Sequence, residues 1–246
     1  MGNRGDAPRT VLQAGNEGEK VGAGDNEGTT MPFIVLVSSP KGGVGKSSIA
    51  RNLLVSAAQA GHSVIGLDLD AQKTTTTWAK RRENVRKTMS SLPAVPVIFY
   101  PLEEWRAGLR EAKAAANDLV VIDTPPSVEL NVAAIAAVAA VADLTLVPSL
   151  PSQDDLDSVG PWMKQLRDGQ RRAAFVLNRA NARTKSYTTM RTKMLGIGAV
   201  CPTEIPTLEE IMMASSKGLG VLDMTNARSA ETFQGLWNFV CLEIGL

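Results

Sequence analysis

Short apolar runs alternate with longer stretches of mixed polarity from residue 33 to the end of the chain. The runs lack the polar alternation of half-exposed strands, which is typical of strands buried on both faces of a parallel sheet. We expect strands over Phe33–Ser38, Ser63–Asp68, Val95–Tyr100, Leu119–Asp123, Leu144–Pro148 and Ala173–Asn178, with a weaker one near Ala199–Ile205. We expect helices over Ser47–Ala60, Thr75–Lys87, Glu103–Ala116, Glu129–Ala140, Asp154–Arg167, Lys185–Leu195, Leu208–Ser216 and Ala230–Leu242. This order predicts one doubly wound α/β domain, a mostly parallel sheet with helices on both faces.

Residues 1–30 break this pattern, because they are rich in Gly, Asn, Asp and Glu and contain almost no clustered apolar residues. Such a segment buries too little surface to offset the entropy lost on ordering, so it predicts a disordered tail. Either it is a leader without function or it is an arm that binds a partner. The folded domain is expected over residues 31–246.

The net charge is close to zero, with 26 Lys and Arg against 25 Asp and Glu, so it does not indicate a nucleic-acid partner. Any site for a polyanion must therefore come from local clustering. The two cysteines, Cys201 and Cys241, lie far apart without C-x-x-C spacing, which argues against a zinc or iron–sulfur site. No signal-like segment follows the basic residues of the N-terminus, and Val132–Ala142 is too short to cross a bilayer. We expect a cytoplasmic protein.

The first predicted strand leads directly into a glycine-rich loop followed by a helix, which is the setting of a Walker A phosphate-binding loop. The glycines let backbone N–H groups converge on phosphate oxygens, and the helix N-terminus adds positive potential. Lys46 would bridge the β- and γ-phosphates and Ser47 would reach Mg²⁺. The nucleotide-binding residues are predicted to be Gly42, Gly43, Val44, Gly45, Lys46, Ser47 and Ser48.

A second lysine, Lys41, opens this loop and makes the motif K-G-G-x-G-K-S. This motif resembles the deviant Walker A of the ParA/MinD (SIMIBI) family of P-loop ATPases, and the resemblance extends over residues 33–246. It implies that ATP closes a homodimer in which Lys41 reaches the phosphates of the partner's ATP. A cation there would neutralise charge that develops during phosphoryl transfer. From the residues alone, a solvated loop lysine is the less favoured alternative for Lys41.

Three aspartates lie at or just after the ends of predicted strands, at the edge of the sheet where α/β proteins place ligands. The segment D-L-D-A-Q resembles the family's D-x-D-P-Q, with Ala71 in place of proline. The resemblance assigns Asp70 to the attacking water and Asp68 to the magnesium shell; otherwise both would cap the next helix. Asp123 ends an apolar strand as a Walker B carboxylate, and the matching family residue holds Mg²⁺. The predicted metal site is thus Ser47, Asp68 and Asp123, and the predicted catalytic residues are Lys41, Lys46 and Asp70.

Two further segments resemble nucleotide contacts of the family. Asn178 precedes Arg179 after a strand, where the family uses an asparagine against the adenine edge, and Pro206 falls where the family packs backbone against adenine. Asn178 could also belong to a simple turn at a strand end. Residues 148–156 resemble the P-x-x-P-S-x-x-D loop of small ParA proteins, which lies near the nucleotide and the dimer interface. A proline-rich connection with Ser152 as a helix cap explains this loop equally well.

A run of basic residues without acids lies in the C-terminal half. By itself this run favours a solvated helix face over a phosphate-binding patch. The resemblance implies non-specific DNA binding by the dimer. The predicted DNA-binding residues are Arg183, Lys185, Arg191, Lys193 and Arg228.

The C-terminal residues 231–246 contain no Lys or Arg, so the basic membrane helix of MinD-like relatives is not expected. We interpret the chain as a small ParA-type partition ATPase. It would use ATP and Mg²⁺, hold non-specific DNA such as the nucleoid, and be stimulated by a ParB-like partner or adaptor. Its cargo would be a plasmid or chromosome region, or alternatively a protein assembly such as a chemoreceptor cluster or carboxysome. A metabolic P-loop enzyme of the dethiobiotin-synthetase type remains a third reading, although Lys41 has no purpose there.

Overall fold

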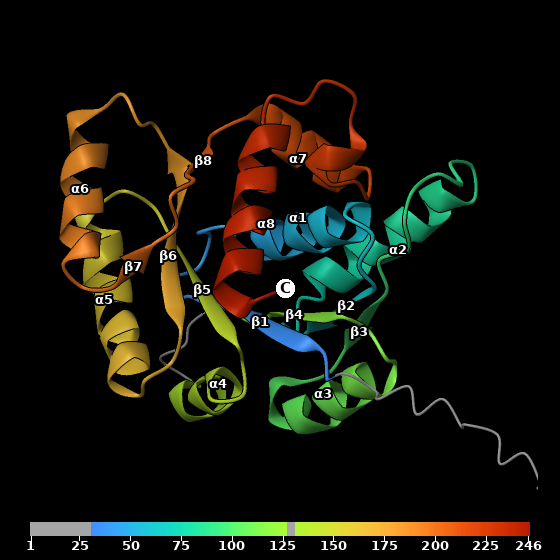
Figure 1. Cartoon of the computed structure of the whole chain (residues 1–246), viewed down its shortest axis with the longest axis horizontal. Helices are drawn as coiled ribbons and strands as arrows, with labels where there is room; N and C mark the ends of the chain where they lie inside the picture. Colours follow the sequence, from blue (N-terminus) through green and yellow to red (C-terminus); the bar gives the residue numbers. More distant parts are fainter. Residues whose placement is uncertain (1–30, 127–130) are drawn as a thin grey trace, which may run out of the picture.

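A parallel β-sheet forms the centre of the molecule in the computed structural model, which describes residues 31–126 and 131–246. Seven strands are hydrogen-bonded in the order β3-β2-β4-β1-β5-β6-β7, and β8 pairs with β6. Every strand pair in the described residues is parallel. The strands are β1 Phe33–Val37, β2 Val64–Asp68, β3 Val97–Phe99, β4 Leu119–Asp123, β5 Leu144–Ser149, β6 Ala173–Ala180, β7 Ala199–Val200 and β8 Ile205–Pro206. The doubly wound α/β architecture is confirmed (Figure 1).

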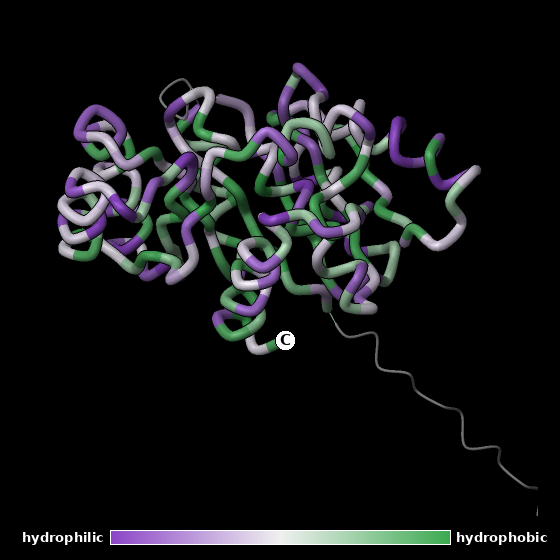
Figure 2. Tube along the Cα trace, turned by 90° about the horizontal axis from the view of Figure 1, so that it is seen from above, coloured by the Kyte–Doolittle hydropathy of each residue, from purple (hydrophilic) through white to green (hydrophobic). Residues whose placement is uncertain are grey.

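Helices cover both faces of this sheet because successive side chains of a strand point to opposite faces. Ile34 and Leu36 of β1 belong to a core that includes residues of α3, α4, α5 and α6, whereas Val35 and Val37 belong to a core with α1, α7 and α8. Figure 2 shows the apolar segments concentrated in the interior between these layers. The helices are α1 Lys46–Gln59, α2 Thr74–Arg86, α3 Trp105–Ala114, α4 Val132–Ala139, α5 Gln153–Asp168, α6 Lys185–Leu195, α7 Glu209–Ser216 and α8 Ala230–Ile244, with 3₁₀ turns η1 Leu102–Glu104 and η3 Val221–Asp223.

The elements differ from the predicted ones mainly at their ends. The single strand expected near Ala199–Ile205 is two short strands, because the chain leaves β7 at Cys201 and Pro202 and pairs again with β6 only at β8. The helix expected from Glu103 begins as η1 and becomes α-helical at Trp105. The predicted tail, residues 1–30, and the first residues of the helix expected from Glu129 lie outside the described residues. Within the described part of the chain, no helix combines the length and apolar character that a membrane span requires.

The registers bring three strand ends to one edge of the sheet. Asp123 at the end of β4 is the neighbour of Asp68 in β2 and of Val37 in β1. The loop after Val37 leads into α1, and the chain after Asp68 leads into α2. Two acids and a glycine-rich loop therefore lie side by side at the carboxyl edge of the sheet, where open α/β sheets bind ligands.

A buried ion pair ties α2 to the segment after α7. The Arg82 side chain, 1% exposed, contacts the Asp223 carboxylate at 2.5 Å and 3.2 Å through its two terminal nitrogens. It also donates to the carbonyl of Pro93. Gly218 has φ +76°, and a Cβ there would lie 2.4 Å from the Arg82 backbone nitrogen. The close approach allowed by glycine and the paired charges hold this segment directly against α2.

Replacing Arg82 by Ala is expected to lower the free energy of unfolding by about 3–5 kcal/mol, because Asp223 would stay buried without its partner. Urea denaturation followed by circular dichroism measures this loss. Arg86→Ala is the matched control on the same helix: its pair with Glu83 is more exposed, with 29% and 60% of the two side chains accessible. The control should lose less than about 1 kcal/mol. Equal losses in the two variants would contradict the structural role given to Arg82.

Candidate functional site

The loop between β1 and α1 has the form that its glycines predict. Gly43 and Gly45 have φ of +74° and +95°, a region that side chains rarely adopt, and α1 begins directly after Gly45. The Lys46 ammonium folds back over the loop and donates to the carbonyl of Lys41 at 3.1 Å. Burial lowers the pKa of Lys46, against the opposing effect of the Asp123 and Asp70 carboxylates. The result is a curled loop with a desolvated ammonium at a helix N-terminus, which is an anion-binding arrangement.

Asp123 is buried, with 1% of its surface exposed. Its Oδ2 accepts a hydrogen bond from the Thr75 hydroxyl at 2.6 Å, whereas its Oδ1 has no hydrogen-bond partner among the described residues. Burial raises the pKa of Asp123 to about 6 and the charge of Asp68 adds to the rise, whereas the hydrogen bond from Thr75, the nearby Ser47 hydroxyl and the charge of Arg51 oppose it. A carboxylate with an unpaired buried oxygen is a ready ligand for a cation.

This chemistry fits Mg²⁺ as the group that would be held beside Ser47 and Asp123. Mg²⁺ prefers oxygen ligands, uses only one or two from protein, and keeps waters or phosphate oxygens for the rest. The residues that the structure describes contain no group of three or more His, Cys, Asp and Glu suited to an all-protein metal site. Mg²⁺ beside Ser47 and Asp123 would take its remaining ligands from water and phosphate oxygens.

Asp68 is already engaged by the start of α2. Its Oδ2 accepts from the backbone nitrogen and the hydroxyl of Thr76, both at 2.8 Å, and its Oδ1 accepts from the Asp70 nitrogen at 3.1 Å. Burial raises the pKa of Asp68, and these hydrogen bonds oppose that rise. Asp68 thus anchors α2 next to Asp123, and its contact with a metal shell stays a prediction.

Asp70 lies just outside the end of β2 and is largely buried. Its Oδ1 accepts from the backbone nitrogen of Gln72 at 2.9 Å, which closes a turn that the missing proline at Ala71 does not disrupt. Its charge opposes the fall in the pKa of Lys46 that burial causes. A role for Asp70 in orienting water stays a prediction.

Lys41 forms an ion pair within its own chain. Its Nζ lies 3.0 Å from Oδ2 of Asp155, and the two side chains are 37% and 3% exposed. The same carboxylate accepts a hydrogen bond from Ser152, the N-cap of α5. The loop over residues 148–156 is therefore connected to the phosphate loop through Asp155. The predicted reach of Lys41 to a partner's ATP requires this contact to open or to be shared.

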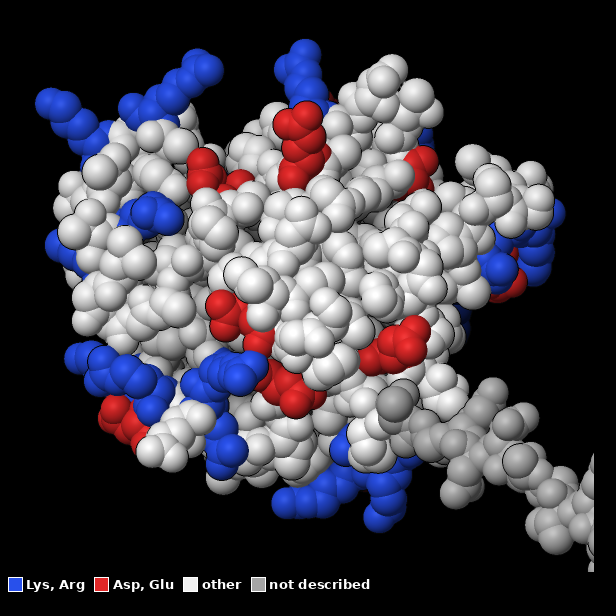
Figure 3. All heavy atoms as spheres, in the orientation of Figure 1, with Lys and Arg blue, Asp and Glu red and all other residues white. Residues whose placement is uncertain are grey.

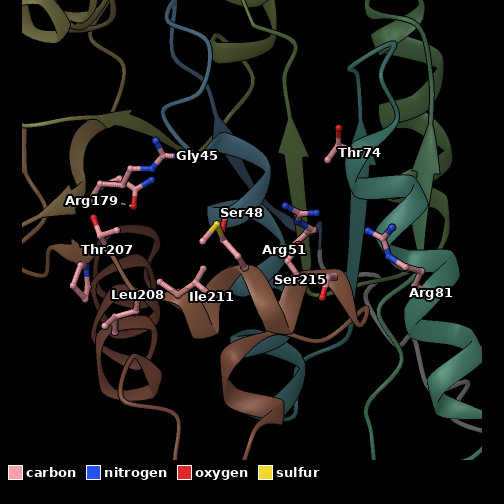
Figure 4. Close-up of a pocket in the computed structure, with 14 residues that line it drawn as sticks. Gly45, Ser48, Arg51, Thr74, Arg81, Arg179, Thr207, Leu208, Ile211 and Ser215 are labelled. Atoms are coloured by element: carbon pink, nitrogen blue, oxygen red, sulfur yellow. Dashed lines mark hydrogen bonds between the residues drawn. The ribbon is translucent and has the colours of Figure 1, made fainter.

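A cavity of about 400 Å³ opens beside the phosphate loop (Figure 4). Gly45, Ser48, Asn178 and Pro206 line it together with residues of α7. Its size and its position next to a phosphate loop suit a nucleoside. The predicted nucleotide contacts Asn178 and Pro206 are thus brought to the same cavity as the loop.

Asn178 also holds the loop in place. Its Nδ2 donates to the Val44 carbonyl at 2.7 Å, and its Oδ1 accepts from the backbone nitrogen of Arg179 at 2.9 Å. A Cβ on Gly45 would lie 2.2 Å from that Nδ2, so the contact requires glycine. Any hydrogen bond to a base would have to use the remaining N–H and lone pair of this amide.

The predicted DNA-binding residues do not form one continuous cluster. Arg183 and Lys185 are exposed at the start of α6, while Lys193 near its end donates to Gln153 of α5 at 2.7 Å. Arg191 is half-buried and lines a hollow with Tyr187 and Pro202. Figure 3 shows basic side chains projecting above α6 and again near the top of α7 and α8, with acidic side chains between the two groups.

Arg228 is exposed on the loop before α8, which is held by Glu210 of α7. The nitrogen and the hydroxyl of Ser229 both donate to Oε1 of Glu210 at 2.6 Å. The side-chain hydrogen bond from Ser229 is the main cause that lowers the pKa of Glu210; backbone hydrogen bonds from this loop and the charge of Arg228 add to it, and burial opposes it. Arg228 therefore projects from an ordered loop but has an acidic neighbour.

Sequence reasoning missed the roles of Thr75, Thr76 and Asp155. The first two belong to the unusual run Thr74–Thr77 at the start of α2, and a hydroxyl-rich helix N-terminus after two aspartates was a usable signal. Asp155 was noted as part of its loop, but its contact with a residue 114 positions earlier leaves no local sign.

The model of the family described as "CobQ/CobB/MinD/ParA nucleotide binding domain" matches residues 35–221. The chain belongs to this family. It is 27% identical over 209 residues to Maintenance of carboxysome distribution protein A of Halothiobacillus neapolitanus, covering 80% of this chain and 91% of that protein. It is 23% identical over 240 residues to septum site-determining protein MinD of Thermotoga maritima, covering 84% and 87% of the two chains.

Solved structures of this family share the fold. A candidate plasmid partition protein of Borrelia burgdorferi B31, bound to AMPPNP, superposes with a TM-score of 0.67 at 15% identity. The match covers 87% of this chain and 100% of that one. Membership in the ParA/MinD group, predicted from Lys41 and the Walker loop, is confirmed, and members of this group are ATPases.

Asp123→Asn is expected to flatten the pH dependence of stability between about pH 4 and 6 in metal-free protein. The unfolded carboxyl loses its proton near pH 4, whereas the folded one keeps it to about 6. The free energy of unfolding therefore falls across this window as pH rises, by on the order of 2–3 kcal/mol from this group. Thermal unfolding in EDTA at several pH values measures the effect, with Asp143→Asn, an acid bonded to Ile34 on β1, as the control. A wild-type profile unchanged by Asp123→Asn would contradict the burial of an ionisable charge at this position.

Proposed function

We propose that this protein is an ATP-driven switch of the ParA type that positions a cargo along DNA. ATP binding would close a homodimer, the dimer would hold DNA without sequence specificity, and a ParB-like partner or adaptor would stimulate hydrolysis and release. The observation that carries the proposal is Lys41, which stands at the mouth of the phosphate loop and is held 3.0 Å from Asp155. A P-loop enzyme that acts as a monomer has no use for this second lysine.

The chain's own groups have distinct tasks in this scheme. Backbone N–H groups of the loop and the Lys46 ammonium hold the phosphates, and the cavity at Asn178 and Pro206 holds the nucleoside. Asp70 orients the attacking water by accepting a hydrogen bond from it. Mg²⁺, held near Ser47 and Asp123, would neutralise phosphate charge during transfer.

Asp155 gives Lys41 a defined position before a partner arrives. The pair is half-exposed on the lysine side and buried on the carboxylate side, so an incoming phosphate competes with Asp155 for the ammonium. In the dimer Lys41 would move to the partner's ATP, where a cation stabilises the developing charge. The protein would stay associated with the nucleoid only as long as the dimer keeps its ATP.

Lys41→Ala is expected to retain nucleotide binding within about threefold while losing stimulated ATP hydrolysis by a factor of about a hundred or more. The reason is that Lys41 would act only across a closed dimer, whereas Lys46 contacts phosphate in each chain. Titration with a fluorescent ATP analogue and phosphate release in the presence of DNA and partner measure the two properties. Lys46→Ala is the comparison and should lose binding itself. Parallel loss of binding and hydrolysis in Lys41→Ala would refute the role across the interface.

Retention on DNA tests the proposal as a whole. Wild-type protein with ATP should bind plasmid DNA and release it with ADP, and Arg183→Gln combined with Lys185→Gln should weaken binding. Each lost phosphate contact should reduce the slope of log affinity against log salt by about 1. Arg228→Gln tests the separate loop.

The matched control removes two charges elsewhere, by Arg110→Gln and Lys113→Gln on α3. It should leave DNA binding unchanged. If ATP-loaded wild-type protein did not bind DNA, or if the control lost as much affinity as the test variant, the proposed function would fail.

The cargo is either a DNA region or a protein assembly. A plasmid or chromosome region is the first candidate, and the candidate partition protein of Borrelia burgdorferi supports it through its fold. The carboxysome-distribution relative, aligned over 80% of this chain, supports the second candidate. Both depend on ATP-dependent DNA retention, which a metabolic enzyme of the dethiobiotin-synthetase type would lack.

A further inference from the structure

The nucleoside cavity has a second end that the predicted contacts with ATP do not use. At one end lie Asn178 and Pro206, and at the other the cavity reaches Thr74 and Arg81 of α2. Figure 4 shows Arg51 of α1 between these two ends, close to Ser215 of α7. The fourteen lining residues include three arginines and no acid. The cavity is therefore electropositive along its length, from Asn178 and Arg179 at one end to Arg81 at the other.

Arg51 is an unusual residue for this position because it is only 8% exposed. Its Nε donates to the Ser47 carbonyl at 2.8 Å, and its terminal nitrogens have no hydrogen-bond partner among residues 31–126 and 131–246. It also forms no ion pair with a described residue, unlike Arg82 one helix away. Burial lowers the pKa of Arg51, with Asp123 and Asp68 opposing at longer range and Arg81 adding to the fall. The terminal nitrogens of Arg51 are not among the fully buried unpaired atoms, so they reach the cavity that Arg51 lines, and their N–H groups are available to a ligand.

Arg81 faces the same space from α2. It is exposed, has no hydrogen bond or ion pair among the described residues, and its charge acts on Arg51. Hydroxyl groups of Thr74, Ser215 and Ser216 complete this end of the cavity. Two guanidinium groups line this end of the cavity together with hydroxyls and without a carboxylate, which suits the charge and the acceptor oxygens of a phosphate group.

We propose that Arg51 and Arg81 form a second phosphate subsite beside the nucleotide, which rests on the nucleotide site of the proposed function. The phosphates of ATP are taken by the loop at Gly43–Ser47, so this subsite receives a further phosphate. That phosphate belongs to the ribose 2′ or 3′ position of the bound nucleotide or to a separate phosphorylated small molecule. Occupation would let the switch respond to a second ligand in addition to ATP.

Calorimetry on the full chain separates the two sources. Adenosine 2′,5′-bisphosphate and adenosine 3′,5′-bisphosphate are compared with AMP, which tests a phosphate on the same ribose. Pyrophosphate is titrated into protein saturated with Mg-ADP, which tests a separate ligand. In at least one arm we expect a gain: a bisphosphate that binds about tenfold or more tighter than AMP, or pyrophosphate binding to the ADP complex.

Variants assign that gain to the two arginines. Arg81→Gln and Arg51→Gln should each reduce it by about tenfold, because each removes a charge-assisted contact. Lys80→Gln is the matched control: it removes one charge from the same helix, outside the cavity, and should keep the gain. Arg81 is on the surface, so Arg81→Gln decides the matter even if Arg51→Gln fails to fold.

The outcomes distinguish the subsite from the proposed function. If wild-type protein binds ADP but shows no gain in either arm, or if the gain survives both Arg81→Gln and Arg51→Gln, the subsite is overturned and the ATP switch stands. If wild-type protein does not bind ADP, the proposed function and the subsite fall together.

Discussion

Negative charge buried at the carboxyl edge of the sheet is the constraint on which the site depends. Parallel pairing brings Asp68 and Asp123 to adjacent strand ends, where both lie almost entirely out of water. Burial raises the pKa of both acids, because neither has a full counter-charge in direct contact. Hydroxyl and N–H groups of α2 supply part of the compensation, and Lys46 and Arg51 act from α1. A bound cation together with a phosphate would neutralise the remaining charge of these buried groups.

Much of this arrangement could be predicted from sequence because its signals are local. Apolar strands, the glycine-rich loop and the strand-end aspartates each occupy a short stretch with a characteristic spacing. The loop also showed its own conformational requirement, since Gly43 and Gly45 adopt the positive φ that only glycine accepts readily. The fold class and the position of the phosphate loop therefore followed from residues that are neighbours in the chain.

The remaining contacts could not be predicted because they join residues far apart in sequence. Lys41 meets Asp155, Asn178 meets Val44, and Arg82 meets Asp223 only after the sheet has assembled. The basic residues of the C-terminal half also form one run in the sequence. In the structure they lie on different sides of α6 and on the loop before α8. Side-chain direction and burial, rather than residue type, decided these cases.

The placement of α2 gives the molecule a mechanical connection. Its first turn is bonded to Asp123 and Asp68 through Thr75 and Thr76, and two turns later Arg82 is bonded to Asp223. Gly218 packs directly against the backbone of α2 at this second connection. A displacement of the two acids would therefore act on the segment after α7 through α2, because the same helix is bonded at both places.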